Sequence, residues 1–367
     1  MIGKKAVLLV LGVVIAAFLS CRKDVPVPLE PVTVPAPVSP VVFNMDSVPY
    51  PTLSTYNFFE APMAELRPVH GVLPYAPITP AFGDYAHKVR FVWMPPGAKA
   101  NYVADHKALD FPEGTILIKS PYYDKVLPNL GRRVLDTRLM IKKNGTWTFA
   151  IYVWNEEQTE AYLDMSGTNI PLTWVDDNGG SHEEVFRIPS AGECLACHMD
   201  HSAPTPISAK PQNLNSTFAY AGGPMNQLAK WTSQGYLAGG YPANIETIAK
   251  WDDPNETLDR RVRAYLDMNC SHCHYDGGFC SYRPMRFAWH DSSNPANLGI
   301  CIPPDDPFAP GVDYIVKAGS ANRSMLYYRM NSVEEAVRMP LLERTVRDTA
   351  ALELIKTWIN AMPDTCS

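Results

Sequence analysis

The sequence predicts an α+β protein of several domains, with an antiparallel domain of the β-sandwich or barrel-like type first and two mainly α-helical regions after it. The 367 residues are enough for two or three domains. Up to position 189 short alternating runs are separated by turn residues, whereas helical patterns in proline-containing loops follow. The composition, 46% hydrophobic and 19% charged, excludes a disordered chain, and the net charge of −6 argues against nucleic acid as a partner.

The N-terminus has the pattern of an export signal. Lys4 and Lys5 precede an apolar run over 6–19, which is too short for a ~20-residue membrane span but suits a signal peptide over 1–20. The sequence FLSC that ends this run resembles a bacterial lipobox, so Cys21 is the expected lipidation site, although Phe18 departs from the usual aliphatic residue. The alternative is an ordinary cleaved signal followed by an unrelated cysteine.

Residues 21–45 are predicted to form a tether. Prolines at 26, 28, 31, 35, 37 and 40 prevent a helix or a central strand and favour an extended polyproline conformation. A spacer directly after a lipid anchor holds the folded part away from a membrane. We therefore expect a periplasmic or cell-surface protein anchored by lipid to the inner or outer membrane, with the outer membrane favoured.

Residues 46–189 are predicted to form the β-rich domain. The clearest strand patterns begin at Val89, Thr115, Thr137 and Leu172. The dipeptides at 144–145 and 178–179 are both Asn-Gly, which predicts two hairpins. Three tryptophans alternate with polar residues and favour a core over a binding face: they are Trp147, Trp154 and Trp174.

Two regions with helical patterns follow, over 190–250 and 251–367. The segment that begins at 256 places Leu258, Val262 and Leu266 on one helical face. A last helix is predicted over 348–361, with Leu352 and Ile355 on its apolar face.

The motif C-x-x-C-H occurs once in each of these two regions, as Cys194, Cys197 and His198 and as Cys270, Cys273 and His274. It is the attachment signature of a c-type haem, because two thiols one helical turn apart can add to both vinyl groups of one porphyrin while the histidine ligates the iron. With only 8 Cys and 9 His in the chain, two matches by chance are not expected. The sequence thus predicts two covalent haem c groups.

A zinc site or a redox dithiol is the alternative reading of these cysteines. A four-thiolate zinc site does not require the two histidines, and a thioredoxin-like motif needs a βαβ context that is absent. Export also favours haem, because free thiols oxidise outside the cytoplasm.

The sixth ligands of the two irons are less determined by sequence. For the second haem Met339, followed by Pro340, is the preferred thioether ligand, and Met330 and Met285 are its rivals. For the first haem Met225 is the preferred residue. The other possibilities are a vacant position or a histidine from the β domain: His70, His87, His106 or His182.

Three further cysteines remain: Cys280, Cys301 and Cys366. In an exported protein two of them are expected to pair, and Cys280 with Cys301 would close a modest loop in the second haem region. His272 and His290 are expected to be ordinary exposed or hydrogen-bonded side chains rather than iron ligands.

Blocks outside the two motifs resemble a family of bacterial dihaem c-type cytochromes. In the N-terminal half these blocks are APITPAFGDYAHKVRFVWMPPG, FPEGTILIKS, DTRLMIKKNGTW and YVWNEEQTEA; in the C-terminal half they include IPSAGECLACH, NQLAKWTSQGYL, WDDPNETLDRRVRAYLDMNCSHCH, NLGIC and SMLYYRMNS. The resemblance spans 74–361. It implies a β-rich domain joined to cytochrome c-like α domains, and it supports Met339, but not Met225, as a ligand.

These observations predict a carrier of single electrons that works with redox partner proteins of the cell envelope. One alternative is a dihaem peroxidase or oxidase with an open first haem, for which Glu156, Glu157 and Glu160 are possible acids or bases. The other is a docking subunit that acts through the β domain.

Overall fold

The computed structural model of the chain describes residues 37–306 and 309–366. The predicted signal peptide, the predicted lipidation site Cys21 and most of the predicted tether lie outside the described residues. Val38–Ser367 forms one compact unit. Within the described part, no helix is both long enough and apolar enough to cross a membrane.

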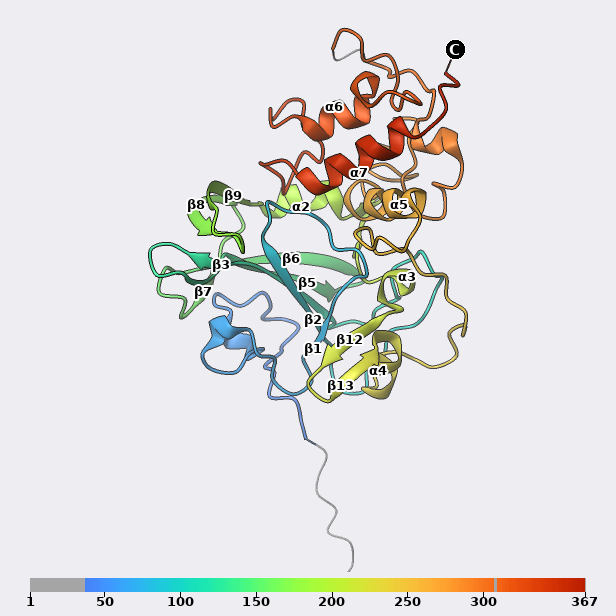
Figure 1. Cartoon of the computed structure of the whole chain (residues 1–367). Coiled ribbons are helices and arrows are strands. Elements are labelled where there is room, and N and C mark those ends of the chain that lie inside the picture. The colour runs from blue at the N-terminus through green and yellow to red at the C-terminus, as the bar shows by residue number, and fades with distance from the viewer. Residues whose placement is uncertain (1–36, 307–308, 367) are drawn as a thin grey trace, which may run out of the picture. The chain divides into compact units, whose positions relative to one another are not determined.

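An antiparallel sheet of nine strands is the centre of the fold (Figure 1). The strand order is β1-β2-β3-β5-β6-β7; β4 and β8 also pair with β3, and β9 pairs with β8. All these pairs are antiparallel. The strands are β1 (Leu73–Tyr75), β2 (His87–Trp93), β3 (Ile116–Val126), β4 (Gly131–Val134), β5 (Asp136–Lys143), β6 (Thr146–Trp154), β7 (Ala161–Leu163), β8 (Thr168–Val175) and β9 (Ser181–Ile188).

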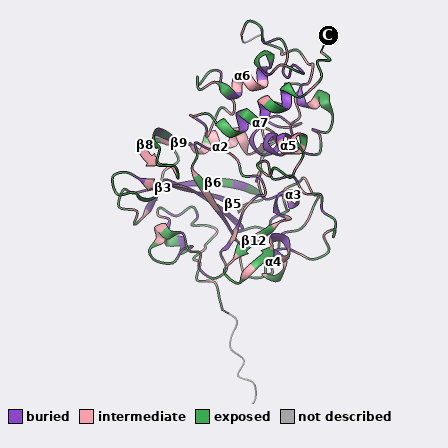
Figure 2. Ribbon diagram, viewed as in Figure 1, coloured by how far each residue is buried: buried purple, intermediate pink, exposed green. Residues whose placement is uncertain are grey.

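Both faces of this sheet are covered. Side chains alternate between the faces along a strand, so Phe91 and Trp93 of β2 enter one core while Val92 enters another. The first core is completed by apolar residues of 48–72, and the second by residues of 209–245. Burial on both faces explains why the central strands read as near-continuous apolar runs, and Figure 2 shows these strands mostly in the buried colour.

The predicted β-rich part is confirmed as an antiparallel, mainly β structure, while the nine strands are linked into one sheet rather than two separate sheets. The second half of β3 carries β4 and β8, where a third core forms around Tyr123 and Phe186. Trp147 and Trp154 are buried core residues on opposite faces, as expected for core tryptophans.

The two predicted hairpins are present. Asn144 and Gly145 connect β5 to β6 with φ values of 54° and 77°, the left-handed conformation that a two-residue turn of this type requires. The second hairpin joins β8 to β9 through a longer loop, because the last paired residues are Val175 and Ser181. Local turn chemistry was therefore sufficient to locate both connections.

The segment 190–250 is short-helical and partly extended rather than a separate α domain. Its Leu214, Leu228 and Trp231 belong to the second core of the sheet, so this segment covers a sheet face and has its core in common with the β part. Its elements are α2 (Ala191–Cys197), β10 (Met199–Asp200), β11 (Ala203–Pro204), α3 (Pro211–Leu214), β12 (Thr217–Tyr220), β13 (Gly223–Asn226) and α4 (Gln227–Ser233).

The C-terminal segment has a core of its own. Helices α5, α6 and α7 pack together around residues that include Leu266, Ile355 and Trp358 (Figure 1). The two predicted helices are confirmed as α5 and α7. The elements are α5 (Leu258–Asn269), α6 (Met325–Asn331) and α7 (Thr349–Asn360); short 3₁₀ helices are η1 (Ser54–Tyr56), η2 (Met63–Glu65), η3 (Pro295–Leu298) and η4 (Ala321–Arg323).

The expected Cys280–Cys301 disulfide is wrong. Cys301 pairs with Cys366, and Cys280 is a buried free thiol. The chain after α7 returns to the middle of this segment, where Lys317 Nζ donates to the carbonyl of Cys366 at 3.0 Å. This return, which brings position 366 next to 301, is a tertiary feature that cysteine spacing does not reveal.

Candidate functional site

The two C-x-x-C-H motifs adopt the same local structure at the end of a helix. In the first, the backbone N–H of His198 donates to the carbonyl of Cys194 at 3.0 Å; in the second, His274 N–H donates to Cys270 at 3.1 Å. The first motif ends α2, and the second follows the last turn of α5. One turn of backbone thus places two thiols and an imidazole close together in each region.

Helix α2 is fixed at its start by a capping box. The Ser190 hydroxyl accepts from the N–H of Glu193 at 3.2 Å, and the Glu193 carboxylate accepts from the Ser190 N–H at 2.6 Å. Arg187 of β9 also donates to Glu193 at 2.8 Å. The sheet therefore holds the helix that carries the first motif.

The imidazole of His198 is neutral and has one nitrogen fixed by a hydrogen bond. Its Nδ1 lies 3.0 Å from the carbonyl oxygen of Thr205 and therefore donates a proton to it, which leaves Nε2 as the basic nitrogen. Burial lowers the pKa of His198 to about 4, so the ring is neutral near pH 7. A neutral ring with one nitrogen committed to a backbone carbonyl is the usual state of an iron-bound histidine.

A cavity of about 140 Å³ adjoins His198. Its apolar wall includes Leu117, Met140 and Phe149 of the sheet, and the Phe149 ring lies edge-on to the imidazole with 5.5 Å between ring centres. Charged side chains form another part of the wall: Arg90, Lys119, Arg138, Glu193 and Glu343.

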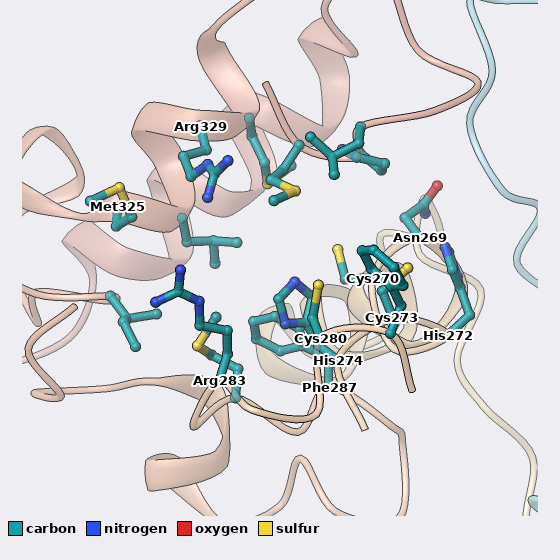
Figure 3. A pocket seen from close by; sticks show the side chains of 18 of the residues that line it. Asn269, Cys270, His272, Cys273, His274, Cys280, Arg283, Phe287, Met325 and Arg329 are labelled. Carbon is teal, nitrogen blue, oxygen red and sulfur yellow. The ribbon is translucent and has the colours of Figure 1, made fainter. Parts of the chain in front are cut away.

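A larger cavity of about 280 Å³ adjoins His274. In Figure 3 the side chains of Cys270, Cys273 and His274 lie on one side of this space, with Arg329 across it. Burial lowers the pKa of His274 to about 4, and its Nδ1 is buried without a hydrogen-bond partner among the described residues. The second motif therefore also presents a neutral imidazole to a cavity.

Met339, the preferred sixth ligand in the sequence analysis, lies in the wall of the His274 cavity. Its backbone is fixed on both sides, because its N–H donates to the Arg329 carbonyl at 3.1 Å and its carbonyl accepts from Arg344 at 3.1 Å. Met330 and Met285 line the same cavity, so all three expected thioethers are brought to the second motif.

Met225 requires a correction. It lies on β13 opposite Phe218, is 37% exposed, and lines neither cavity. The hairpin of β12 and β13 turns this side chain toward solvent, so the structure does not bring it to His198.

The histidines of the β domain are not brought to His198 either, and none of the four lines its cavity. His106 stacks on His290 with 4.0 Å between ring centres, His182 pairs with Asp176 at 2.8 Å, and His87 stacks on Tyr122. In their place Met140, Met268 and His272 line the cavity. Met140 lies in an apolar run of β5, and nothing in the sequence linked it to a motif more than fifty positions away.

The two cavities share a wall. Cys197, Asn269, His272, Pro340 and Leu342 line both of them. One ligand atom from each of Cys197, His272 and Cys273 lies within 4.8 Å of the others. A hydrogen bond with Cys273, together with burial, raises the pKa of the Cys197 thiol, so it stays protonated near neutral pH. The two motifs, distant in sequence, thus meet in space.

The residues of both motifs fit a covalently attached haem. Each has two thiols and a neutral imidazole, and each adjoins a cavity with a largely apolar wall and candidate thioether ligands. No known family model matches the chain, and comparisons with curated proteins and with solved structures found no match.

Proposed function

We propose that this chain is a dihaem c-type cytochrome that transfers single electrons in the bacterial cell envelope. One haem c is held by residues 194–198 and the other by residues 270–274. When bound, haem supplies a one-electron iron couple, while the protein supplies axial ligands, burial and orientation.

The observation that carries this proposal is the repetition of one local structure at two adjoining cavities. Each C-x-x-C-H turn has the same hydrogen bond from histidine to the first cysteine, and Cys197 and His272 line both cavities. Two redox groups held this way are close neighbours, which suits transfer between them and onward to a partner protein.

The chain's own residues determine how the irons are held. The Thr205 carbonyl orients His198 by accepting its Nδ1 proton, which increases the basicity of Nε2. Met339 is the proposed sixth ligand of the second iron, on a backbone fixed by Arg329 and Arg344. For the first iron the sixth ligand is to be sought among Met140, Met268 and His272.

The proposed location and partners rest on the sequence alone. Export through the predicted signal peptide, lipidation at Cys21 and the proline-rich tether place the folded part at a membrane surface facing the periplasm or the exterior. Redox proteins of the envelope are the proposed donors and acceptors.

A metal site is the second candidate function, favoured by the cluster of Cys197, His272 and Cys273. Two thiols and an imidazole are ligands that zinc prefers. The same two cysteines cannot both bind zinc in this way and carry thioether bonds, so the two functions exclude each other.

The decisive experiment is expression in a host with working cytochrome maturation machinery, followed by intact mass and haem analysis of the denatured protein. We expect a mass gain of two haems that survives denaturation. A Cys194→Ala/Cys197→Ala variant should lose one haem, and a Cys270→Ala/Cys273→Ala variant should lose the other.

Cys280 provides a matched control, because its thiol lines the second cavity but lies outside both motifs. Cys280→Ser should keep both haems. A wild-type protein without haem that holds one equivalent of zinc, lost on replacing Cys197 or Cys273, would replace the cytochrome proposal by the metal site.

A further inference from the structure

A row of three cations crosses the sheet beside His198. Arg90 of β2 is directly opposite Lys119 of β3, and Lys119 is directly opposite Arg138 of β5. All three side chains line the cavity of the first motif. Like charges at opposed positions repel one another, so such a row is unfavourable unless anions compensate it.

Two carboxylates compensate part of this charge. Asp136 accepts two hydrogen bonds from Arg138, at 2.8 and 3.0 Å. Glu343 accepts from Lys119 at 3.0 and 3.1 Å and also pairs with Arg138. Both anions are thus committed to Lys119 and Arg138.

In the described part of the chain, Arg90 has no carboxylate in direct contact, although the charge of Glu343 acts on it from a distance. It is 7% exposed, and within the described residues its guanidinium forms no hydrogen bond or ion pair. Lys88, on the same strand and two positions earlier, is only partly charged near pH 7, because burial lowers the pKa of its amine to about 7; this amine donates to the Ala81 carbonyl at 2.9 Å. A guanidinium that lines a cavity and forms no hydrogen bond can bind an anion that enters the cavity.

We propose that Arg90, together with Lys119 and Arg138, binds the propionate carboxylates of the first haem. The inference rests on the proposed function and adds to it a role for the β domain, whose sheet becomes one wall of a haem site. Guanidinium groups bind carboxylates with two parallel hydrogen bonds, which suits a planar anion that enters this cavity. The occupant brings the negative charge that Arg90 lacks.

The test compares the holoproteins of wild type, Arg90→Gln and Arg132→Gln by potentiometric titration. Arg132 is the matched control, because it lies on the same sheet but is half-exposed, pairs with Asp124 and lines neither cavity. Loss of a cation beside a propionate favours the ferric state. In Arg90→Gln we therefore expect one of the two potentials to fall by about 59 mV, a tenfold change in a one-electron equilibrium.

The potential of the second haem in Arg90→Gln, and both potentials in the control Arg132→Gln, should be unchanged. The fall should persist in a Cys270→Ala/Cys273→Ala background, which keeps only the first haem, and Arg90→Lys should restore most of the potential because it retains the charge. If Arg90→Gln does not retain the first haem, retention of that haem by Arg90→Lys supports the inference.

Two results would overturn it. Unchanged potentials in an Arg90→Gln protein that carries two haems would show that Arg90 does not face a propionate. A shift of the wild-type potential on adding succinate, absent in Arg90→Gln, would identify a soluble carboxylate as the occupant. A wild type without any haem refutes the proposed function instead, so the two failures are distinguishable.

Discussion

At the scale of single residues, Asp84 shows how one buried carboxylate connects distant parts of the chain. It is 1% exposed and precedes β2. Its Oδ1 accepts from the backbone N–H groups of Thr345 and Val346 at 2.7 and 3.1 Å, and its Oδ2 accepts from the Thr345 hydroxyl at 3.0 Å. Burial nevertheless raises the pKa of Asp84, since desolvation outweighs these hydrogen bonds.

Replacing Asp84 by Asn should be far less harmful than replacing it by Ala. Asparagine keeps an acceptor at the Oδ1 position and tolerates the local φ of 49°, whereas alanine leaves two amides of the C-terminal segment unpaired. We expect Asp84→Ala to lower the free energy of unfolding by about 1–3 kcal/mol more than Asp84→Asn, as measured by urea denaturation.

The pH dependence of the free energy of unfolding provides a second test of the role of Asp84. Because the native pKa of Asp84 exceeds its unfolded value, the native state holds the proton more tightly, and this contribution to stability is lost as pH rises through the native pKa. Asp84→Asn, which cannot titrate, should remove this contribution from the slope of the free energy of unfolding against pH. An Asp84→Ala variant as stable as Asp84→Asn would contradict the assignment.

At the scale of elements, the capping box of α2 offers a test that does not touch the motif itself. Ser190→Ala removes the acceptor for the Glu193 N–H and should lower the free energy of unfolding by about 1 kcal/mol. Ser190→Thr keeps the hydroxyl and should remain close to wild type. Ser233→Ala, at the end of α4 where an exposed hydroxyl donates to the Lys230 carbonyl at 2.9 Å and caps no N–H group, should be close to neutral. Equal losses for Ser190→Ala and Ser190→Thr would argue against the cap.

The elements that the sequence predicted correctly are those specified by local rules. The hairpin at Asn144 and Gly145 follows from a φ requirement of two residues, and α5 and α7 follow from apolar periodicity. The segment 190–250 was misjudged as an α domain. The apolar character of Leu228 and Trp231 predicts that they are buried, but it does not identify the residues against which they pack. Their partners, such as Val92 and Leu117, lie over a hundred positions earlier.

The same distinction applies to the candidate site. The C-x-x-C-H motifs and the Met339 position could be read from the sequence, since each is a short pattern. Met225 was chosen by its distance along the chain from His198, which does not measure its distance in space. Arg90 could not be anticipated, because its position depends on strand register and its lack of a partner on the whole fold.

At the scale of the whole molecule, the Cys301–Cys366 disulfide ties the C-terminal tail to the segment before η4. It closes a loop with a sequence separation of 65 residues, so its loss increases the entropy of the unfolded chain. Cys366→Ser, or reduction of the wild type, should lower the free energy of unfolding by about 2–5 kcal/mol. Cys280→Ser, which breaks no bridge, is the control for that measurement. Unfolding midpoints that reducing agent leaves unchanged would speak against the pairing.

The two segments that carry the motifs differ in whether each has an apolar core of its own. Helices α5, α6 and α7 enclose a core made within the C-terminal segment, which includes Val262, Leu266 and Ile355. The segment around the first motif has no separate core, because Leu214, Leu228 and Trp231 belong to a core that includes residues of the sheet. An isolated 190–250 fragment would expose these side chains to water.

The excised segments should therefore behave differently. Produced with an export signal in a host that matures cytochromes, residues 251–367 should unfold cooperatively and carry one haem, since 270–274, Met339 and their core are all present. Residues 190–250 alone should show no cooperative unfolding by circular dichroism, because burying Trp231 requires Leu117 and its neighbours on the sheet. A fragment 38–250 restores those partners and should recover cooperative unfolding, which makes it the control. If 190–250 folded alone, the sheet would be dispensable for the first site, and the charge row of Arg90, Lys119 and Arg138 would have to serve another ligand.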